Sequence, residues 1–162
     1  MALFAAPHLP EVKGVIALEP YTNAAKVIHR APASGLFGHR WLARWISSGE
    51  IDKAILRADQ RLGVDLTHID TGTAVAKARA CTLILGGSKD VLIPSAAMHD
   101  LAGLSPRARF VRVDGEGHMT LPLRTDRLFR PMLAWIDALP VGHHGACPDY
   151  VPGTVGSLRP GQ

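Results

Sequence analysis

The sequence predicts an α/β fold with about three parallel strands and flanking helices. Three apolar runs, at residues 12–18, 82–85 and 110–113, lack strict alternation of apolar and polar positions. Such runs are typical of strands that are buried on both faces, as in a parallel sheet. The second and third runs each lead into a glycine-rich turn that carries one titratable side chain, Asp90 or His118. Functional groups of parallel sheets lie just beyond the carboxyl ends of strands, so we expect these two side chains to meet at one rim.

Length and composition agree with one globular domain. A chain of 162 residues with 47% hydrophobic and 20% charged residues is long enough to bury a core. The net charge of +4 comes from scattered arginines without a dense basic run, which argues against a nucleic-acid partner. No segment approaches the roughly 18 apolar residues of a membrane span, and residues 1–6 do not resemble a signal peptide. We therefore expect the chain, as written, to be cytoplasmic.

The two cysteines, Cys81 and Cys147, do not form the framework of a disulfide-rich domain. Cys81 opens a predicted buried strand, so we expect it to be a reduced core residue. Gly and Pro dominate the last part of the chain, and residues 140–162 are predicted to be a flexible tail.

Helical patterns fill the segments between the strands. The first six residues favour a helix that stops at Pro7, and Thr22 or Asn23 is a candidate N-cap for the next helix. A loop is expected from Pro32 to residue 38. The last helix is predicted to point Leu128, Met132, Trp135 and Ile136 inward. The predicted helices span residues 1–6, 21–30, 50–61, 73–80, 95–104 and 123–139.

Asp90 and His118 have the chemistry of an orienting acid and a general base. The ordinary pKa of histidine, near 6.5, allows proton exchange at neutral pH, and a carboxylate beside the ring fixes its tautomer. Each residue also has a simpler interpretation, His118 as an exposed loop histidine and Asp90 as a turn-forming residue.

The two turns together resemble the C-terminal portion of an α/β-hydrolase of the serine esterase or peptidase type. Residues 87–90 with Pro94 match the acid turn of that family, and residues 115–118 match its histidine turn, 28 residues later. The resemblance covers residues 1–139 and implies a partial α/β-hydrolase fold that cleaves an ester, amide or peptide bond of a small-molecule or peptide-like substrate. It implies His118 as base and Asp90 as acid, with no cofactor. Glu19 is an alternative acid, because it also follows a predicted strand.

The resemblance also implies a nucleophilic serine shortly before Met1. None of the serines present lies in a Gly-x-Ser-x-Gly turn between a strand and a helix. We therefore expect a truncated unit that lacks the nucleophile and is inactive alone. In the family the first strand pairs with the nucleophile strand, so an open sheet edge and self-association are predicted.

Residues 36–62 are the expected cap-like helices. Phe37, Trp41 and Trp45 recur every four residues, which predicts an aromatic stripe on an amphipathic helix. This stripe is interpreted as core packing, as a cap over a hydrophobic substrate pocket, or as a membrane-surface helix.

Two further hypotheses belong to other classes of function. The chain is a non-catalytic interaction module if the Trp41 and Trp45 helix is a binding face. It is a metal-binding protein if His143, His144 and Cys147 act as ligands, although the tail offers no second ligand cluster and we expect no metal. The spacing of a phosphate-binding loop is not met around Gly86.

Overall fold

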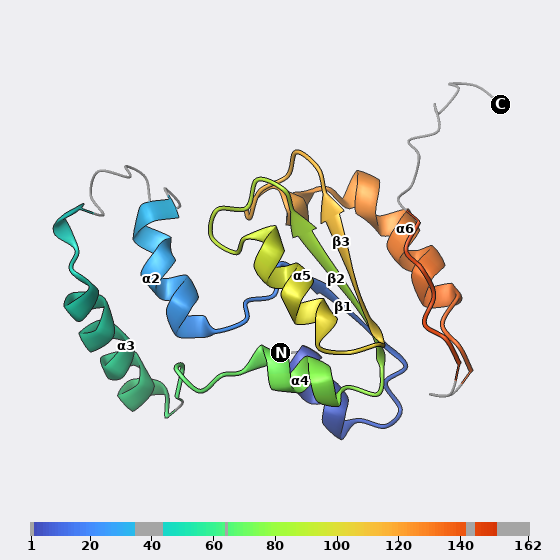
Figure 1. Cartoon of the computed structure of the whole chain (residues 1–162), viewed down its shortest axis with the longest axis horizontal. Helices are drawn as coiled ribbons and strands as arrows, with labels where there is room; N and C mark the ends of the chain where they lie inside the picture. The colour runs from blue at the N-terminus through green and yellow to red at the C-terminus, as the bar shows by residue number, and fades with distance from the viewer. Residues whose placement is uncertain (1, 35–43, 64, 142–144, 152–162) are drawn as a thin grey trace.

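The computed structural model describes residues 2–34, 44–63, 65–141 and 145–151, and it contains one parallel three-stranded sheet (Figure 1). The strand order is β1-β2-β3, with parallel pairing of β2 to both neighbours. The predicted fold class, three parallel strands with flanking helices, is therefore confirmed. The strands are β1 (Gly14–Leu18), β2 (Cys81–Gly87) and β3 (Ala108–Val113).

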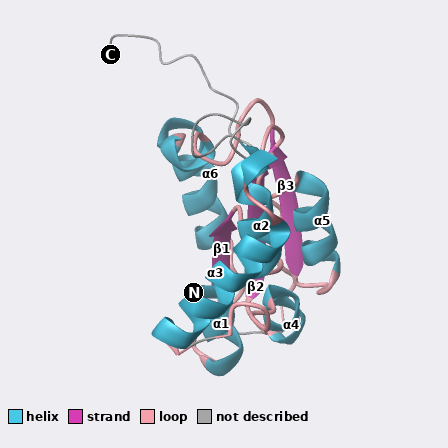
Figure 2. Cartoon of the chain, turned by 90° about the vertical axis from the view of Figure 1, so that its left-hand side faces the viewer, coloured by secondary structure: helices cyan, strands magenta, loops and turns pink. Residues whose placement is uncertain are grey.

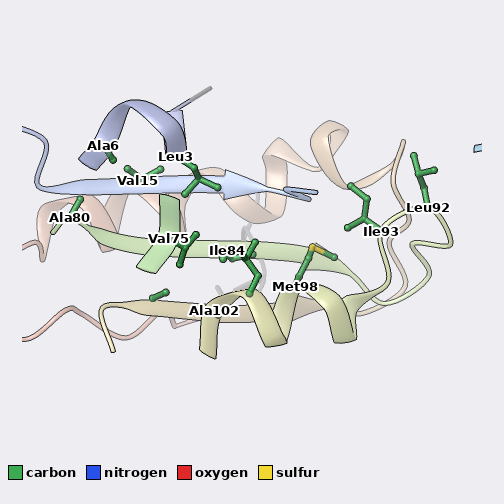
Figure 3. Packing of buried hydrophobic residues seen from close by; sticks show 12 residues of the cluster. Leu3, Ala6, Val15, Val75, Ala80, Ile84, Leu92, Ile93, Met98 and Ala102 are labelled. Carbon is green, nitrogen blue, oxygen red and sulfur yellow. The ribbon is translucent and has the colours of Figure 1, made fainter. Parts of the chain in front are cut away.

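Helices cover both faces of the sheet. On one face α1 (Ala2–Ala5), α4 (Thr71–Lys77) and α5 (Ser95–Gly103) form a layer, and on the other lies α6 (Thr125–Asp137) (Figure 1). Every residue of β2 is buried, as its unbroken apolar run predicts. Ile84 points into the first layer (Figure 3), while Leu83 and Leu85 pack with side chains of α6. The core is thus two clusters separated by the sheet.

Two helices lie to one side of the sheet. These are α2 (Ala24–Ser34) and α3 (Ser48–Leu62), which pack against each other (Figure 1, and nearest the viewer in Figure 2). A capping box between Ser47 and Glu50 starts α3, and the predicted helix at residues 50–61 is confirmed. Of the predicted aromatic stripe, Phe37 and Trp41 lie outside the described residues, and Trp45 is 79% exposed.

The structure corrects three local predictions. Helix α2 continues through Pro32 instead of ending there, because a proline in the last turn removes only one helical hydrogen bond. Helix α4 starts before residue 73, because the carboxylate of Asp70 accepts the backbone N–H of Gly72 at 2.9 Å and caps the helix. Ile136 is 45% exposed and not inward, whereas Trp135 beside it is buried.

The prediction of a reduced Cys81 is wrong, because Cys81 and Cys147 form a disulfide. The bond joins the first residue of β2 to a segment, residues 145–151, that runs beside α6 (Figure 1). Nε1 of Trp135 donates to the carbonyl oxygen of Pro148 at 2.9 Å, and Arg107 donates to that of Gly145 at 3.1 Å. Part of the predicted tail is therefore anchored on the domain, and Cys147 is not available as a metal ligand. The sequence separation of 66 residues gave no local signal for this pairing.

Within the described ranges, no helix combines the length and the apolar character needed to cross a membrane.

Candidate active site

Three side chains meet where the parallel strands end. Glu19 directly follows β1, while Asp90 and His118 lie in the loops that follow β2 and β3. Parallel strands bring their carboxyl ends to one edge of the sheet, so three distant parts of the sequence converge there. The sequence predicted that Asp90 and His118 share this rim, and the structure brings them together.

The imidazole of His118 contacts the carboxylate of Asp90. Nδ1 of His118 lies 3.0 Å from Oδ2 of Asp90, and the other carboxylate oxygen accepts the backbone N–H groups of Leu92 and Ile93, both at 2.8 Å. The Asp90 side chain is fully buried, whereas that of His118 is 29% exposed. A fixed, buried carboxylate on one ring nitrogen leaves Nε2, which bonds to no described residue, for a reacting group.

Backbone contacts between the two loops set this geometry. The N–H of Lys89 donates to the carbonyl of Glu116 at 2.7 Å, and the N–H of Ser88 donates to that of Val113 at 3.0 Å. Glycine is required at position 87, because a Cβ atom there would lie 2.4 Å from the carbonyl oxygen of Glu116. Gly115 starts the turn toward His118 with a φ of 85°. This backbone conformation is unfavourable for residues that have a Cβ atom, so it favours glycine.

Sequence reasoning did not single out Glu116, which ties the histidine loop to α6. Its side chain is 6% exposed and accepts a hydrogen bond from Nε of Arg124 at 2.8 Å. It also forms an ion pair with Arg127, at 3.7 Å. The hydrogen bond from Arg124 lowers the pKa of the Glu116 carboxyl. The sequence signals for this contact are an acid two residues before the histidine and two arginines, Arg124 and Arg127, at the start of α6.

Glu19 approaches the same ring nitrogen and does not replace Asp90. Its Oε2 lies 3.4 Å from Nδ1 of His118, its side chain is 3% exposed, and its Oε1 has no partner among the described residues. Burial raises the pKa of the Glu19 carboxyl to about 8, and the charge of Asp90 adds to this effect. Both candidate acids therefore lie against one imidazole.

The site offers few other ligand groups. Ligand atoms of Glu19, Asp90 and His118 lie within 4.8 Å of one another. We assign no cation to them, because Oδ1 and Oδ2 of Asp90 and Nδ1 of His118 are already engaged in hydrogen bonds. The sequence around Gly86 forms the end of β2, so it provides no phosphate-binding loop.

Exposed apolar side chains and a groove lie in the segments that carry the three site residues. Val91 and Met119, which follow the acid and the histidine in the chain, are 63% and 62% exposed, and Leu123 is 75% exposed. A groove of about 260 Å³ runs between α1 and the residues of β1 and includes Glu19 in its wall. Such surfaces suit an apolar part of a ligand.

Comparisons with known proteins agree with this architecture. No family model matches the chain. A pimeloyl-[acyl-carrier protein] methyl ester esterase of Xanthomonas campestris pv. campestris is 31% identical over 75 residues, which is 46% of this chain and 30% of the esterase. The chain thus matches less than a third of the length of its curated relatives.

Two solved structures superpose on most of the chain. An α/β-hydrolase enzyme from a deep-sea metagenome library has a TM-score of 0.57 at 16% identity, over 86% of this chain and 62% of that one. A putative non-heme bromoperoxidase of Mycobacterium tuberculosis has a TM-score of 0.56 at 14% identity, over 86% and 63%. Together with the three-stranded parallel sheet, these likenesses establish that the chain carries part of the α/β-hydrolase fold.

Proposed function

We propose that this chain contributes the base and the orienting acid to serine-type hydrolysis of an ester, with His118 as base and Asp90 as acid. The observation that carries the proposal is the 3.0 Å contact between Nδ1 of His118 and the buried carboxylate of Asp90. The esterase among the relatives favours an ester over an amide or peptide bond as the scissile group.

The proposed chemistry follows from the two ring nitrogens. Nε2 of His118 removes the proton of a serine hydroxyl as its oxygen attacks the ester carbonyl, and the resulting imidazolium is stabilised by Asp90. The imidazolium then gives this proton to the departing alkoxide, which leaves an acyl-enzyme. Water, deprotonated by the same nitrogen, releases the acid and restores the serine.

The serine of this proposal lies outside the 162 residues. Among the described residues no serine hydroxyl bonds to His118. The hydroxyl of Ser88 instead accepts the backbone N–H of Gly115 in the histidine loop, and that of Ser105 accepts the N–H of Arg107. The chain alone is therefore expected to hydrolyse esters weakly or not at all.

The test extends the chain along its native reading frame. We expect the codons upstream of Met1 to encode Gly-x-Ser-x-Gly, and the extended protein to react with a fluorophosphonate at that serine. His118→Ala should abolish labelling, whereas His99→Ala, at an exposed histidine of α5, should not. A frame without that motif, or labelling that survives His118→Ala, would overturn the proposal.

A second candidate function is a non-catalytic interaction module. It is favoured by the exposure of Trp45, at 79%, beside Ile46, at 45%. This function requires partner binding that survives His118→Ala and fails with Trp45→Ala.

We also infer self-association through β1. Its outer edge pairs with no described strand, and Leu18 at its end is 37% exposed. A lysine substitution at the exposed end of the strand, Leu18→Lys, should shift the chain toward monomer in light scattering; an unchanged mass would refute the inference. The disulfide favours an oxidising compartment over the predicted cytoplasm.

A further inference from the structure

The Nδ1 atom of His118 faces two buried carboxyl groups. Asp90 lies at 3.0 Å and Glu19 at 3.4 Å from this one nitrogen, and the two side chains are 0% and 3% exposed. A neutral imidazole has a single N–H to donate. The shorter contact engages Asp90, so the ring leaves Glu19 without a full hydrogen bond.

A hydrogen bond from the backbone of Gly87 offsets part of a negative charge on Glu19, but burial outweighs it. Its Oε1 is buried without a partner. An ionised carboxylate that is buried and unpaired is strongly disfavoured, whereas the neutral acid gains an O–H donor. The acceptor within reach is the carboxylate of Asp90, because ligand atoms of the two acids and of His118 lie within 4.8 Å of one another.

The charged groups around this cluster are engaged elsewhere or exposed. In the loop after β3, Glu116 pairs with Arg124 and Arg127 of the α6 region, and Asp114 pairs with Arg112 at 3.1 Å. Lys89, beside Asp90 in the loop after β2, is exposed and forms no ion pair with a described residue. No described Lys or Arg therefore neutralises the two acids, and a proton is the remaining means.

The backbone holds Glu19 in this position at a cost. Glu19 is the non-glycine residue with a positive φ, 48°, among the described residues, and its N–H donates to the carbonyl of Leu85 at 2.8 Å. Such a conformation is disfavoured for a residue with a Cβ atom, and it persists where the surroundings fix it, often at functional sites. Here it turns the side chain from the end of β1 toward His118.

We propose that Glu19 is neutral at neutral pH and donates its proton to Asp90, which in turn accepts Nδ1–H of His118. Glu19 is then a positioning residue for the imidazole. The Asp90 carboxylate then has four donors. They are the N–H groups of Leu92 and Ile93, Nδ1–H of His118 and the carboxyl O–H of Glu19. The pair of acids carries one negative charge, which fixes the ring without a second charge beside it.

The role in catalysis rests on the proposed function, but the protonation of Glu19 does not. Above about pH 8 the pair would lose its shared proton, because burial and the charge of Asp90 raise the pKa of Glu19 to that value. The His118 ring would then sense a second negative charge.

NMR titration of the 162-residue chain tests the inference without any nucleophile. With ¹³C-labelled glutamate and ¹⁵N-labelled histidine, we expect the Glu19 carboxyl signal to be that of a neutral acid at pH 7. It should change near pH 8, together with an inflection in the His118 ring signals. Glu19→Gln, which keeps a donor toward Asp90, should remove this inflection and preserve the Nδ1–H tautomer. Glu11→Gln, at an exposed glutamate, is the matched control and should leave it in place.

A second variant separates the causes. Asp90→Asn removes the neighbouring charge and should move the Glu19 midpoint toward acid, while burial keeps it above the ordinary value. A Glu19 signal that titrates near 4.5 in the wild-type chain, or an inflection of His118 that persists in Glu19→Gln, overturns the inference. Failure of fluorophosphonate labelling in the extended protein would leave this result untouched, so the two proposals fail separately.

Discussion

His118 and Asp90 are 28 residues apart in the chain, yet Nδ1 of His118 lies 3.0 Å from Oδ2 of Asp90. Their strands, β3 and β2, are adjacent and parallel, and the loops that follow them are joined by backbone hydrogen bonds. The contact therefore depends on the pairing of β2 with β3, and its presence in solution would show that the two loops pack as in this structure. The predictions below test this rim, the acid pair and the disulfide.

The first prediction concerns the tautomer of His118. A carboxylate at Asp90 accepts a hydrogen bond from Nδ1–H, so the wild-type ring should carry its proton on Nδ1. In Asp90→Asn the amide oxygen keeps the backbone N–H groups of Leu92 and Ile93, and its NH₂ group faces the ring. The ring should change to the Nε2–H tautomer, as measured by ¹⁵N chemical shifts. Asp114→Asn, at a side chain that is 78% exposed, should leave the tautomer unchanged; the same tautomer in all three proteins would contradict the contact.

The second prediction concerns stability and pH. The pKa of Glu19 is raised from its ordinary value of 4.5 to about 8, so the folded chain holds a proton that the unfolded chain releases. The free energy of unfolding should therefore fall as the pH rises between these values, and the contribution is complete only below 4.5. Glu19→Gln cannot ionise and should reduce this fall by roughly 3 kcal/mol.

Urea unfolding at pH 5 and pH 8 measures this difference. The free energy of unfolding of Glu19→Gln relative to wild type should increase from the lower to the higher pH. A constant difference between the two proteins would mean that Glu19 has an ordinary carboxyl group in the folded state.

The third prediction concerns the disulfide between Cys81 and Cys147. Closing a loop of this length stabilises the folded chain by about 4 kcal/mol in the chain-entropy model. A reducing agent should lower the urea midpoint of the wild-type chain, whereas Cys147→Ser should have a low midpoint with or without the agent. Two free thiols in the folded protein under non-reducing conditions would contradict the bond.

The fourth prediction concerns the close approach at Gly87. In Gly87→Ala the new Cβ atom would lie 2.4 Å from the carbonyl oxygen of Glu116, so the histidine loop must move. We expect a loss of about 2 kcal/mol in the free energy of unfolding and a disturbed ¹⁵N signal of His118. The matched control is Gly103→Ala, whose Cβ atom meets nothing within 4 Å and which ends α5, so its stability should be unchanged or higher. Equal behaviour of the two variants would show that the loops tolerate separation.

Local sequence patterns predicted the three strands and most of the helices of this fold, but not the end of α2, the start of α4 or the exposure of Ile136. The apolar run at β2 and the helical pattern at residues 50–61 act within a few residues, because hydrophobic periodicity depends on near neighbours. The order of the acid turn and the histidine turn also predicted that Asp90 and His118 would meet, because parallel strands align their ends.

Tertiary structure alone decided the contacts between elements that no local pattern connects. The sequence presented Glu19 as a rival to Asp90, whereas the fold places both acids against one nitrogen of His118. No pattern in the sequence indicated that Cys81 pairs with Cys147 or Glu116 with Arg124. Such contacts depend on how the strands pair and on where the chain returns after α6. Burial of Glu19 in the folded chain then favours its protonated form. Propensity and spacing predict the strands and turns. The raised pKa of Glu19 depends on burial, which arises only when the three loops pack together and exclude water.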